Sequence, residues 1–396
     1  MQEHSRQQVA HAVADRLEAV EHSASLGAFI GFDGFIDTLI RVVDTRHAMA
    51  TDAYAPIPTI DAFADRVRAA AGKNANLELV PLERRFGGNG PLMAAALAGL
   101  GAGVRYVGAI GSPDAHDRVH PLFRPFADQC AEAIAIAPPA ETDALEFDDG
   151  KLMLGKPANV QLPTWALLRE RVGVERIRAM AAQSGLIGLV NWVMMGGLPG
   201  IWQGLIDDIL PGLPAPTHTP GGPRRVFVDL CDPRRRTDDD LRAACAQLAE
   251  MNALASVTLG LNLAESQRLC ALTGVAAPSD ADGWTPGEAL AAAAERVRGA
   301  LRLDAIVIHT RRGAAGADAA GDRGCFLGPF TRRPAMSTGA GDHFNGGFAF
   351  GRLAGLDLAQ ALALGSAVSG AYVRDAASPD RARVCAFLRS LPAPEA

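Results

Sequence analysis

Strand-like and helix-like segments alternate along most of this chain. Short apolar runs of the kind that form buried strands lie at residues 26–32, 104–110, 185–195, 225–230, 255–260 and 304–310. Helical patterns separate these runs, and a crossover helix is the usual connection between parallel strands. The sequence therefore predicts an α/β fold, with a central, mostly parallel sheet flanked by helices on both faces.

Two extended segments interrupt this alternation. Residues 38–48 and 142–156 read as short strands, and the second predicts a hairpin that turns at Asp149-Gly150. We expect segments of about 38–50 and 142–158 to form a small β lid on a single domain of residues 26–390. Residues 1–25 are predicted to be an N-terminal extension with a helix at 6–20, and residues 391–396 a C-terminal tail. The Pro- and Gly-rich segments 211–223 and 274–288 are predicted surface loops.

Charge and composition exclude several functional classes. The net charge is −6, whereas a nucleic-acid surface needs clustered Lys and Arg. No stretch approaches the roughly 18 apolar residues of a membrane span, and the first residues are polar. We therefore expect a cytoplasmic protein without nucleic-acid or membrane partners. The six cysteines include no C-x-x-C pair, which favours reduced thiols over disulfides or structural zinc.

The segment from Ser337 to Phe348 carries the most chemical information. Gly339 and Gly341 let the backbone approach a ligand closely, and the helical pattern that follows directs its positive end to the same point. This arrangement predicts an anion site. A carboxylate there, Asp342, repels an anion unless it accepts a proton, which is the role of a base in phosphoryl transfer. Taken alone, the segment also fits a tight turn capped by Asp342.

Several segments resemble the ribokinase (PfkB-type) carbohydrate kinase family, and they occur in the same order over about residues 26–390. The segment from Ser337 to Phe348 is similar to the family's second signature, roughly D-T-x-G-A-G-D-x-F-x-x-G. The other similar segments are GFDGFID ending at Asp37, FGGNGP at 86–91, Asp232-Pro233 with Arg236, NLAE at 262–265, and Thr310 with Gly313 and Gly316.

The resemblance implies a ribokinase-like fold, a sugar or sugar-like acceptor, ATP as donor and Mg²⁺ as cofactor. It implies that Asp342 is the base for a primary hydroxyl, with Gly339, Ala340 and Gly341 as the anion hole. The implied substrate-binding residues are Asp33, Asp37, Gly87, Gly88 and Asn89. The implied nucleotide-binding residues are Asn262, Glu265, Thr310, Gly313 and Asn345, and Asn262 and Glu265 would hold Mg²⁺ through water.

Most of these residues also have a purely structural interpretation. Gly87 and Gly88 fit a plain turn, Asp33 and Asp37 can cap or solvate a loop, and Asn262 with Glu265 fits ordinary helix capping. Asp37 is the better substrate ligand of the two aspartates, because Asp33 can simply shape the turn.

Some features depart from the family pattern and leave alternatives open. Met336 stands where the family has an aspartate linked to potassium, and thioether sulfur is a poor ligand for that hard cation. The spacing in GFDGFID is closer to ADP-dependent sugar kinases. A nucleoside kinase with Phe32, Phe35 and Trp192 around a base, and a non-catalytic sugar- or nucleotide-binding regulator, also remain possible. A homodimer is also possible. The sequence motifs of dinucleotide-binding enzymes, P-loop kinases, zincins and serine hydrolases are absent.

Overall fold

A nine-stranded sheet forms the centre of the computed structural model, which describes all residues except 1–2, 21–25, 217–222, 279–286 and 396. Its strands lie in the order β16-β15-β14-β13-β12-β11-β1-β5-β8. Neighbours from β14 to β8 are parallel, and β15 and β16 add an antiparallel edge. The predicted α/β fold with a mostly parallel sheet is confirmed.

The apolar runs of the sequence form the middle of this sheet. In β1 every residue is buried, because helices cover both faces and the strand needs no polar side. The strands are β1 (Gly27–Phe32), β5 (Gly103–Gly108), β8 (Glu132–Ala135), β11 (Leu186–Val190), β12 (Arg225–Asp229), β13 (Ser256–Asn262), β14 (Ala305–His309), β15 (Gly313–Asp318) and β16 (Arg323–Leu327).

Two helical layers cover the sheet. Alternate residues of β1 enter different cores: Phe29 faces one layer, and Ala28 and Ile30 face the other. The first layer contains α5 (Trp165–Arg171), α6 (Val174–Ala182), α7 (Leu198–Gly204), α8 (Asp238–Asn252), α9 (Leu263–Thr273) and α10 (Gly287–Leu301). The second contains α1 (Glu3–Glu18), α3 (Asn89–Gly99), α4 (Arg124–Ala127), α11 (Ala340–Leu353), α12 (Leu358–Asp375) and α13 (Arg381–Arg389).

The strand order reverses at β1. The chain passes from β1 to β5 and β8 on one side and returns to β11 on the other. Ligands of open α/β sheets bind at such a switch point, beyond the carboxyl ends of the strands. Asp33 follows β1 and Asn191 follows β11, and the Asn191 Nδ2 donates to Asp33 Oδ2 at 2.7 Å. A buried hydrogen bond therefore joins the segments that follow β1 and β11 at the switch point.

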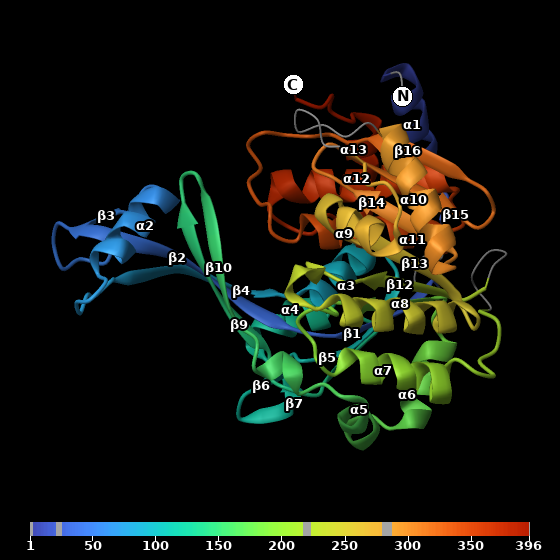
Figure 1. Cartoon of the computed structure of the whole chain (residues 1–396), viewed down its shortest axis with the longest axis horizontal. Coiled ribbons are helices and arrows are strands. Elements are labelled where there is room, and N and C mark those ends of the chain that lie inside the picture. The colour runs from blue at the N-terminus through green and yellow to red at the C-terminus, as the bar shows by residue number, and fades with distance from the viewer. Residues whose placement is uncertain (1–2, 21–25, 217–222, 279–286, 396) are drawn as a thin grey trace.

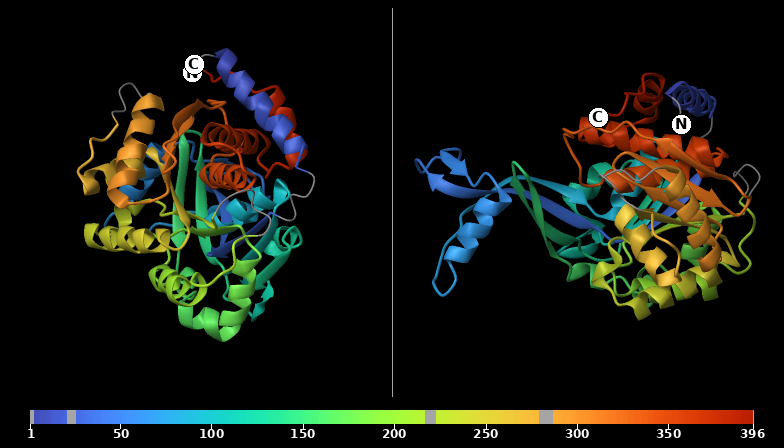
Figure 2. Two further views of the ribbon diagram at one scale, coloured as in Figure 1. Left: turned by 90° about the vertical axis from the view of Figure 1, so that its right-hand side faces the viewer. Right: turned by 45° about the horizontal axis from the view of Figure 1, so that its top comes forward.

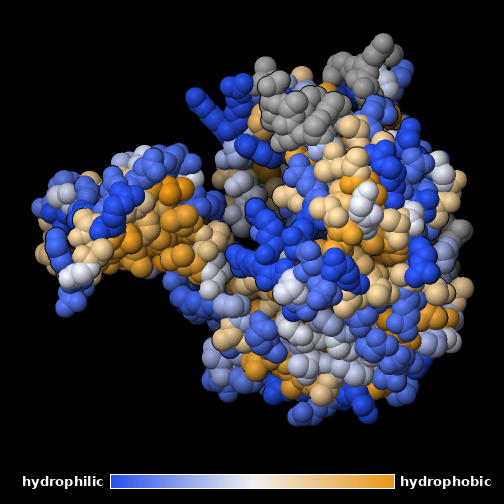
Figure 3. All heavy atoms as spheres, viewed as in Figure 1, coloured by the Kyte–Doolittle hydropathy of each residue, from blue (hydrophilic) through white to orange (hydrophobic). Residues whose placement is uncertain are grey.

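The lid is a second sheet that projects from the body as an arm (Figures 1 and 2). Its strands are β2 (Phe35–Arg46), β3 (Tyr54–Pro56), β4 (Leu79–Gly87), β9 (Ala140–Phe147) and β10 (Gly150–Lys156), and α2 (Ile60–Ala69) lies against it. Apolar side chains from β2, β9 and α2 pack together inside it, and Figure 3 shows an orange area on the surface of the lid. The lid is thus larger than the two predicted segments.

Two details of the lid differ from expectation. Strand β4 was not predicted, and the hairpin turns at Asp148-Asp149, one residue before the predicted position, because Phe147 pairs with Gly150. A further small hairpin joins β6 (Gly111–Ser112) to β7 (Ala115–Val119). Parts of the predicted loops 211–223 and 274–288, and the end of the predicted extension 1–25, lie outside the described residues.

Within the described residues, no helix is both long enough and apolar enough to cross a membrane.

Candidate active site

The loop before α11 separates two cavities. Ser337, Ala340 and Gly341 line a cavity of about 850 Å³, and Thr338 lines a smaller one of about 360 Å³. Gly339 caps α11 with φ of 88°, a conformation that favours glycine, and a Cβ there would lie 2.9 Å from Leu92 Cδ1. The segment predicted to be an anion hole therefore lies between two spaces that can hold ligands.

The first two residues of α11, Ala340 and Gly341, line the larger cavity. The Ala340 amide donates to the Ser337 carbonyl at 3.2 Å, so the Gly341 amide is the better placed donor for a ligand. A Cβ on Gly341 would lie 3.2 Å from His309 Cε1, so a side chain here would crowd the wall. The anion-hole role of Gly339, Ala340 and Gly341 remains a prediction.

Asp342 lies in the first turn of α11 and is 8% exposed. Its Oδ1 accepts a hydrogen bond from Asn89 Nδ2 at 2.8 Å. Burial, and then the charge of Asp229, raise the pKa of Asp342 well above its ordinary value, and the Asn89 hydrogen bond opposes this change. A carboxylate destabilised in this way has a greater tendency to accept a proton.

Asp33 holds the start of α3, where Asn89 lies. Its carboxylate accepts from the Asn89 amide at 3.0 Å, the Gly90 amide at 2.8 Å and the Asn191 side chain, and it is fully buried. The backbone donors are orphan amides of the first turn of α3, which Gly88 cannot cap through a side chain. Burial raises the pKa of Asp33 to about 6 despite these bonds. Its structural role is thus positioning, and substrate contact remains a prediction.

The smaller cavity is built around Asp37 on β2. Arg85 on β4 is its cross-strand neighbour, and both residues line the cavity together with Glu83 and Tyr372. A Cβ on Gly87 would lie 2.4 Å from Asp37 Oδ2, so the glycine makes room for the carboxylate. Burial raises the pKa of Asp37, and the positive charge of Arg85 opposes it. The carboxylate of Asp37 can accept hydrogen bonds from neighbouring hydroxyls, and the guanidinium of Arg85 can donate to them.

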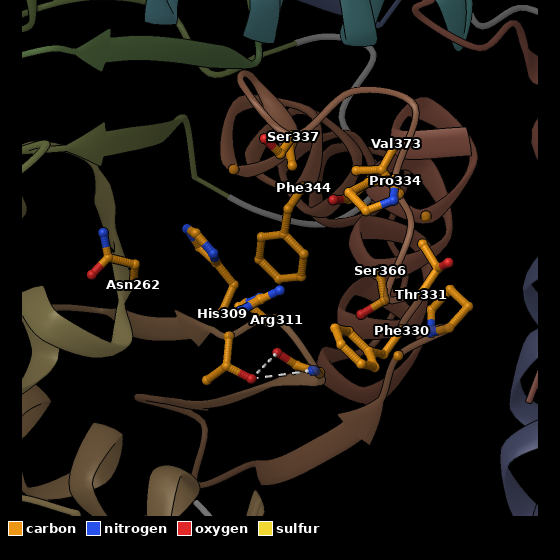
Figure 4. Close-up of a pocket in the computed structure, with 18 of the residues that line it drawn as sticks. Asn262, His309, Arg311, Phe330, Thr331, Pro334, Ser337, Phe344, Ser366 and Val373 are labelled. Atoms are coloured by element: carbon orange, nitrogen blue, oxygen red, sulfur yellow. Dashed lines mark hydrogen bonds between the residues drawn. The ribbon is translucent and has the colours of Figure 1, made fainter. Parts of the chain in front are cut away.

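The larger cavity extends from the lid to the far end of α12. Thr310 and Gly313 line it as predicted, and the Thr310 hydroxyl donates to the Gly313 carbonyl at 3.1 Å. His309 lies against Phe344 with ring centroids 5.1 Å apart, and Figure 4 shows both rings on one wall. Burial lowers the pKa of His309 to about 4, so the imidazole is neutral near pH 7.

Asn262 and Glu265 form a capping box at the start of α9. The Asn262 side chain accepts from the Glu265 amide at 3.0 Å, and Glu265 Oε2 accepts from the Asn262 amide at 2.7 Å. Asn262 also lines the larger cavity, whereas Glu265 is buried behind it. Burial, and then the charge of Asp229, raise the pKa of Glu265 to about 8. The structural interpretation is therefore correct, and nucleotide or metal contact remains a prediction.

Asn345 does not line either cavity. It is 1% exposed, and its side chain donates to Asp229 Oδ2 at 2.6 Å. The structure gives it a positioning role behind the site, and its predicted contact with nucleotide remains untested.

Several residues of the site carried no sequence signal. No sequence motif includes Asn191, Arg85 or Tyr372. The fold brings them to the site from separate segments of the chain. The Tyr372 hydroxyl donates to the Thr338 carbonyl at 2.8 Å, and its ring stacks on His343. The aromatic residues considered for a base pocket, Phe32, Phe35 and Trp192, are instead buried and line neither cavity.

Solved structures share this fold. The ribokinase of Arabidopsis thaliana, solved with ribose and ATP, superposes with a TM-score of 0.60 at 16% identity, over 92% of this chain and 98% of that one. A phosphofructokinase-2 mutant of Escherichia coli superposes with a TM-score of 0.58 at 14% identity, over 92% and 98%. The chain therefore has the ribokinase-like fold, as predicted.

The sequence comparisons identify the family more closely. The model of the prokaryotic ketohexokinase family matches residues 2–391. A ketohexokinase from Haloferax volcanii is 31% identical over 361 residues, which cover 90% of this chain and 89% of the relative. This chain belongs to the prokaryotic ketohexokinase family, and it is a carbohydrate kinase, as predicted.

Proposed function

We propose that this protein transfers the γ-phosphate of ATP to a primary hydroxyl of a ketohexose. The family supports the acceptor class, because its model matches nearly the whole chain. The two cavities support the reaction type, because the segment from Ser337 to Gly341 lies between a space lined by Asp37 and a larger space lined by Thr310. A phosphoryl group can pass between two substrates only at such a junction.

In the proposed complex the sugar occupies the smaller cavity. Asp37 accepts hydrogen bonds from its hydroxyls, and Arg85 donates to them. Asp342 accepts the proton of the attacking hydroxyl, and the Gly341 amide donates to the oxygens of the phosphoryl group. Asn89 orients the carboxylate of Asp342 through their 2.8 Å contact. The nucleotide lies in the larger cavity, along Thr310 and Gly313.

The residues behind the anion hole are compatible with a magnesium ion held through water. Within the described residues, no group of three or more His, Cys, Asp or Glu side chains is arranged to bind a metal directly. Burial, and then the negative charge of Asp229, raise the pKa of both Glu265 and Asp342. The repulsion between these carboxylates would be relieved by a cation nearby. Asn262 and Glu265 would hold hydrated Mg²⁺, which when bound neutralises charge on the nucleotide phosphates.

The observation that carries the proposal is the position of Asp342, a buried carboxylate with a raised pKa beside the Gly341 amide. The test measures ADP release from ATP with fructose, with glucose, ribose, adenosine and no acceptor as comparisons, and repeats the ketohexose assay with ADP as donor. Fructose-dependent release supports the proposal. Turnover only with a nucleoside, or with ADP as donor, would contradict it.

The assigned base has its own test. Asp342→Asn keeps the shape of the side chain but removes the proton acceptor, so kcat should fall by about 10² or more while nucleotide affinity changes little. Steady-state kinetics measure the first quantity, and calorimetric titration with ATP measures the second. A variant that turns over at close to the wild-type rate would show that another group is the base.

A further inference from the structure

A histidine directly after the proposed base lies in the core behind the predicted anion hole. His343 is fully buried, and its ring stacks on that of Tyr372, with centroids 3.6 Å apart and an angle of 14° between the ring planes. Its Nδ1 is 2.8 Å from the Gly339 carbonyl oxygen, and its Nε2 is 2.8 Å from the Ser378 hydroxyl. The stacked ring and the two polar contacts hold the imidazole in one orientation.

These contacts determine which nitrogen carries the proton. The Gly339 carbonyl can only accept a hydrogen bond, so Nδ1 donates to it, and Nε2 accepts from the Ser378 hydroxyl in the neutral ring. Burial lowers the pKa of His343 to about 4, so the ring is neutral near pH 7. The hydrogen bond to Gly339 therefore comes from one defined tautomer.

The stacked pair of His343 and Tyr372 holds the turn before α11 at two carbonyls. The Gly339 carbonyl accepts from the amide and from the ring of His343, at 3.0 and 2.8 Å. The preceding carbonyl, that of Thr338, accepts from the Tyr372 hydroxyl at 2.8 Å. A peptide unit is planar, with its N–H directed opposite to its C=O, so these bonds also fix the amides of Gly339 and Ala340. Two consecutive peptide planes are thus held by side chains.

The turn needs this support because its own sequence is permissive. Gly339 has φ of 88°, and a second glycine, Gly341, follows two residues later. Glycine restricts the backbone less than any other residue does. Hydrogen-bond donors stabilise a transition state best when their directions are fixed before the reaction. The Gly341 amide, the donor best placed for a ligand, lies in the peptide plane next to the two that are held.

We propose that His343 is a positioning residue of the anion hole, and that its Nδ1–H, together with the Tyr372 hydroxyl, holds the turn so that the Gly341 amide points at the transferred phosphoryl group. This inference rests on the proposed function, which gives the anion hole its purpose. His343 lines neither cavity, so it acts through the backbone and not by contact with a substrate. Its contribution is therefore to the rate of the chemical step more than to the affinity for either substrate.

Two amide substitutions distinguish the two ring nitrogens. Asparagine places its Nδ2 close to the position of the histidine Nδ1, whereas glutamine places its Nε2 close to that of the histidine Nε2. We expect His343→Gln to lower kcat by about tenfold or more with little change in either KM, and His343→Asn to retain more of the wild-type kcat. Equal kcat in the two variants would overturn the proposal. A raised KM for the nucleotide at unchanged kcat would also overturn it, because that result describes ground-state binding only.

A second histidine provides the control. His11 on α1 also contacts a backbone carbonyl, that of Arg389, with its Nε2 3.1 Å from the oxygen, and it lines neither cavity. His11→Gln should keep the wild-type kcat. Thermal unfolding of each variant establishes that it folds. The acceptor is the one that the wild-type enzyme phosphorylates fastest, so the failure of ketohexose as a substrate leaves the comparison valid.

Two further measurements leave position 343 unchanged. Tyr372→Phe keeps the ring that stacks on His343 but removes the donor to the Thr338 carbonyl, so kcat should fall while the KM for the nucleotide stays near wild type. An unchanged kcat in this variant would contradict the proposed support of the turn. Nitrogen-15 NMR of wild-type protein labelled at histidine reports the tautomer without an activity assay. We expect the proton of His343 on Nδ1, and a neutral ring with its proton on Nε2 would overturn the proposal.

Discussion

At the scale of single residues, Asn89 links the two halves of the candidate site. Its backbone amide binds Asp33, which anchors the switch point of the sheet, and its side chain binds Asp342, the proposed base. A displacement of the start of α3 therefore also moves the hydrogen-bond donor of the carboxylate that is proposed to accept the proton. The same residue also has an electrostatic function, because its hydrogen bond is the main side-chain contribution that lowers the pKa of Asp342.

We expect Asn89→Ala to move the acid limb of the kcat profile to higher pH. The base acts only when ionised, and its pKa is already raised, so activity is lost as pH falls through that pKa. Loss of the Asn89 hydrogen bond destabilises the carboxylate further. Hydrogen bonds to charged groups contribute about 1.5–3 kcal/mol, so the limb should move by roughly one pH unit or more. The shift is measured from kcat of wild type and variant across pH at saturating substrate concentrations. An acid limb at the same pH in both proteins would contradict the assignment of Asp342 as the base.

The motif residues could be placed from the sequence because their geometry is local. The glycines and Asp342 lie within four positions of one another, and the following helix determines their directions. Asp33 and Asn345 were predicted to contact ligands, which remains untested, and the structure adds that each binds a side chain more than 100 positions away along the chain, Asn191 and Asp229 respectively. Local pattern carries no information about such partners.

At the scale of elements, β4 determines the acceptor side of the site. It pairs with β2, so that Arg85 stands opposite Asp37. The strand escaped prediction because most of its residues are exposed and Pro81 interrupts the apolar run. The register of the β2–β4 pair shifts between Leu39 and Ile40, next to this proline, and such an irregularity accommodates the missing donor. A strand that depends on its partner's register cannot be recognised from its own composition.

Arg85→Met should raise the KM for the sugar by about tenfold or more with a smaller change in kcat. The guanidinium is proposed to donate to acceptor hydroxyls in the ground state and the transition state alike, and one charged hydrogen bond accounts for such a factor. The matched control is Arg84→Met. Arg84 is adjacent on β4, lies 3.6 Å from Glu141 and lines neither cavity. Equal effects of the two substitutions on KM would refute a specific role for Arg85.

At the scale of the whole molecule, the two ends of the chain pack together. Helix α1 lies against α12 and α13, and Figure 1 shows the termini on the same side of the body. The predicted helix at 6–20 matches α1 closely, but its docking site could not be predicted, because the contacts join residues near position 6 to residues beyond 320. Arg6 makes the key contacts: it is fully buried and donates to the Leu327 carbonyl at 2.7 Å and the Pro392 carbonyl at 2.6 Å.

We expect Arg6→Met to lower the free energy of unfolding by about 2–4 kcal/mol while kcat and KM stay near wild type. The substitution keeps the length of the side chain, but it removes charged donors from buried carbonyls, and each orphaned acceptor is costly. Arg6 lines neither cavity, so the loss falls on stability and not on chemistry. Arg16→Met on the exposed face of α1 is the control and should change stability by less than about 0.5 kcal/mol. Denaturant unfolding measures both variants, and similar losses in the two would show that the helix contributes only its general packing.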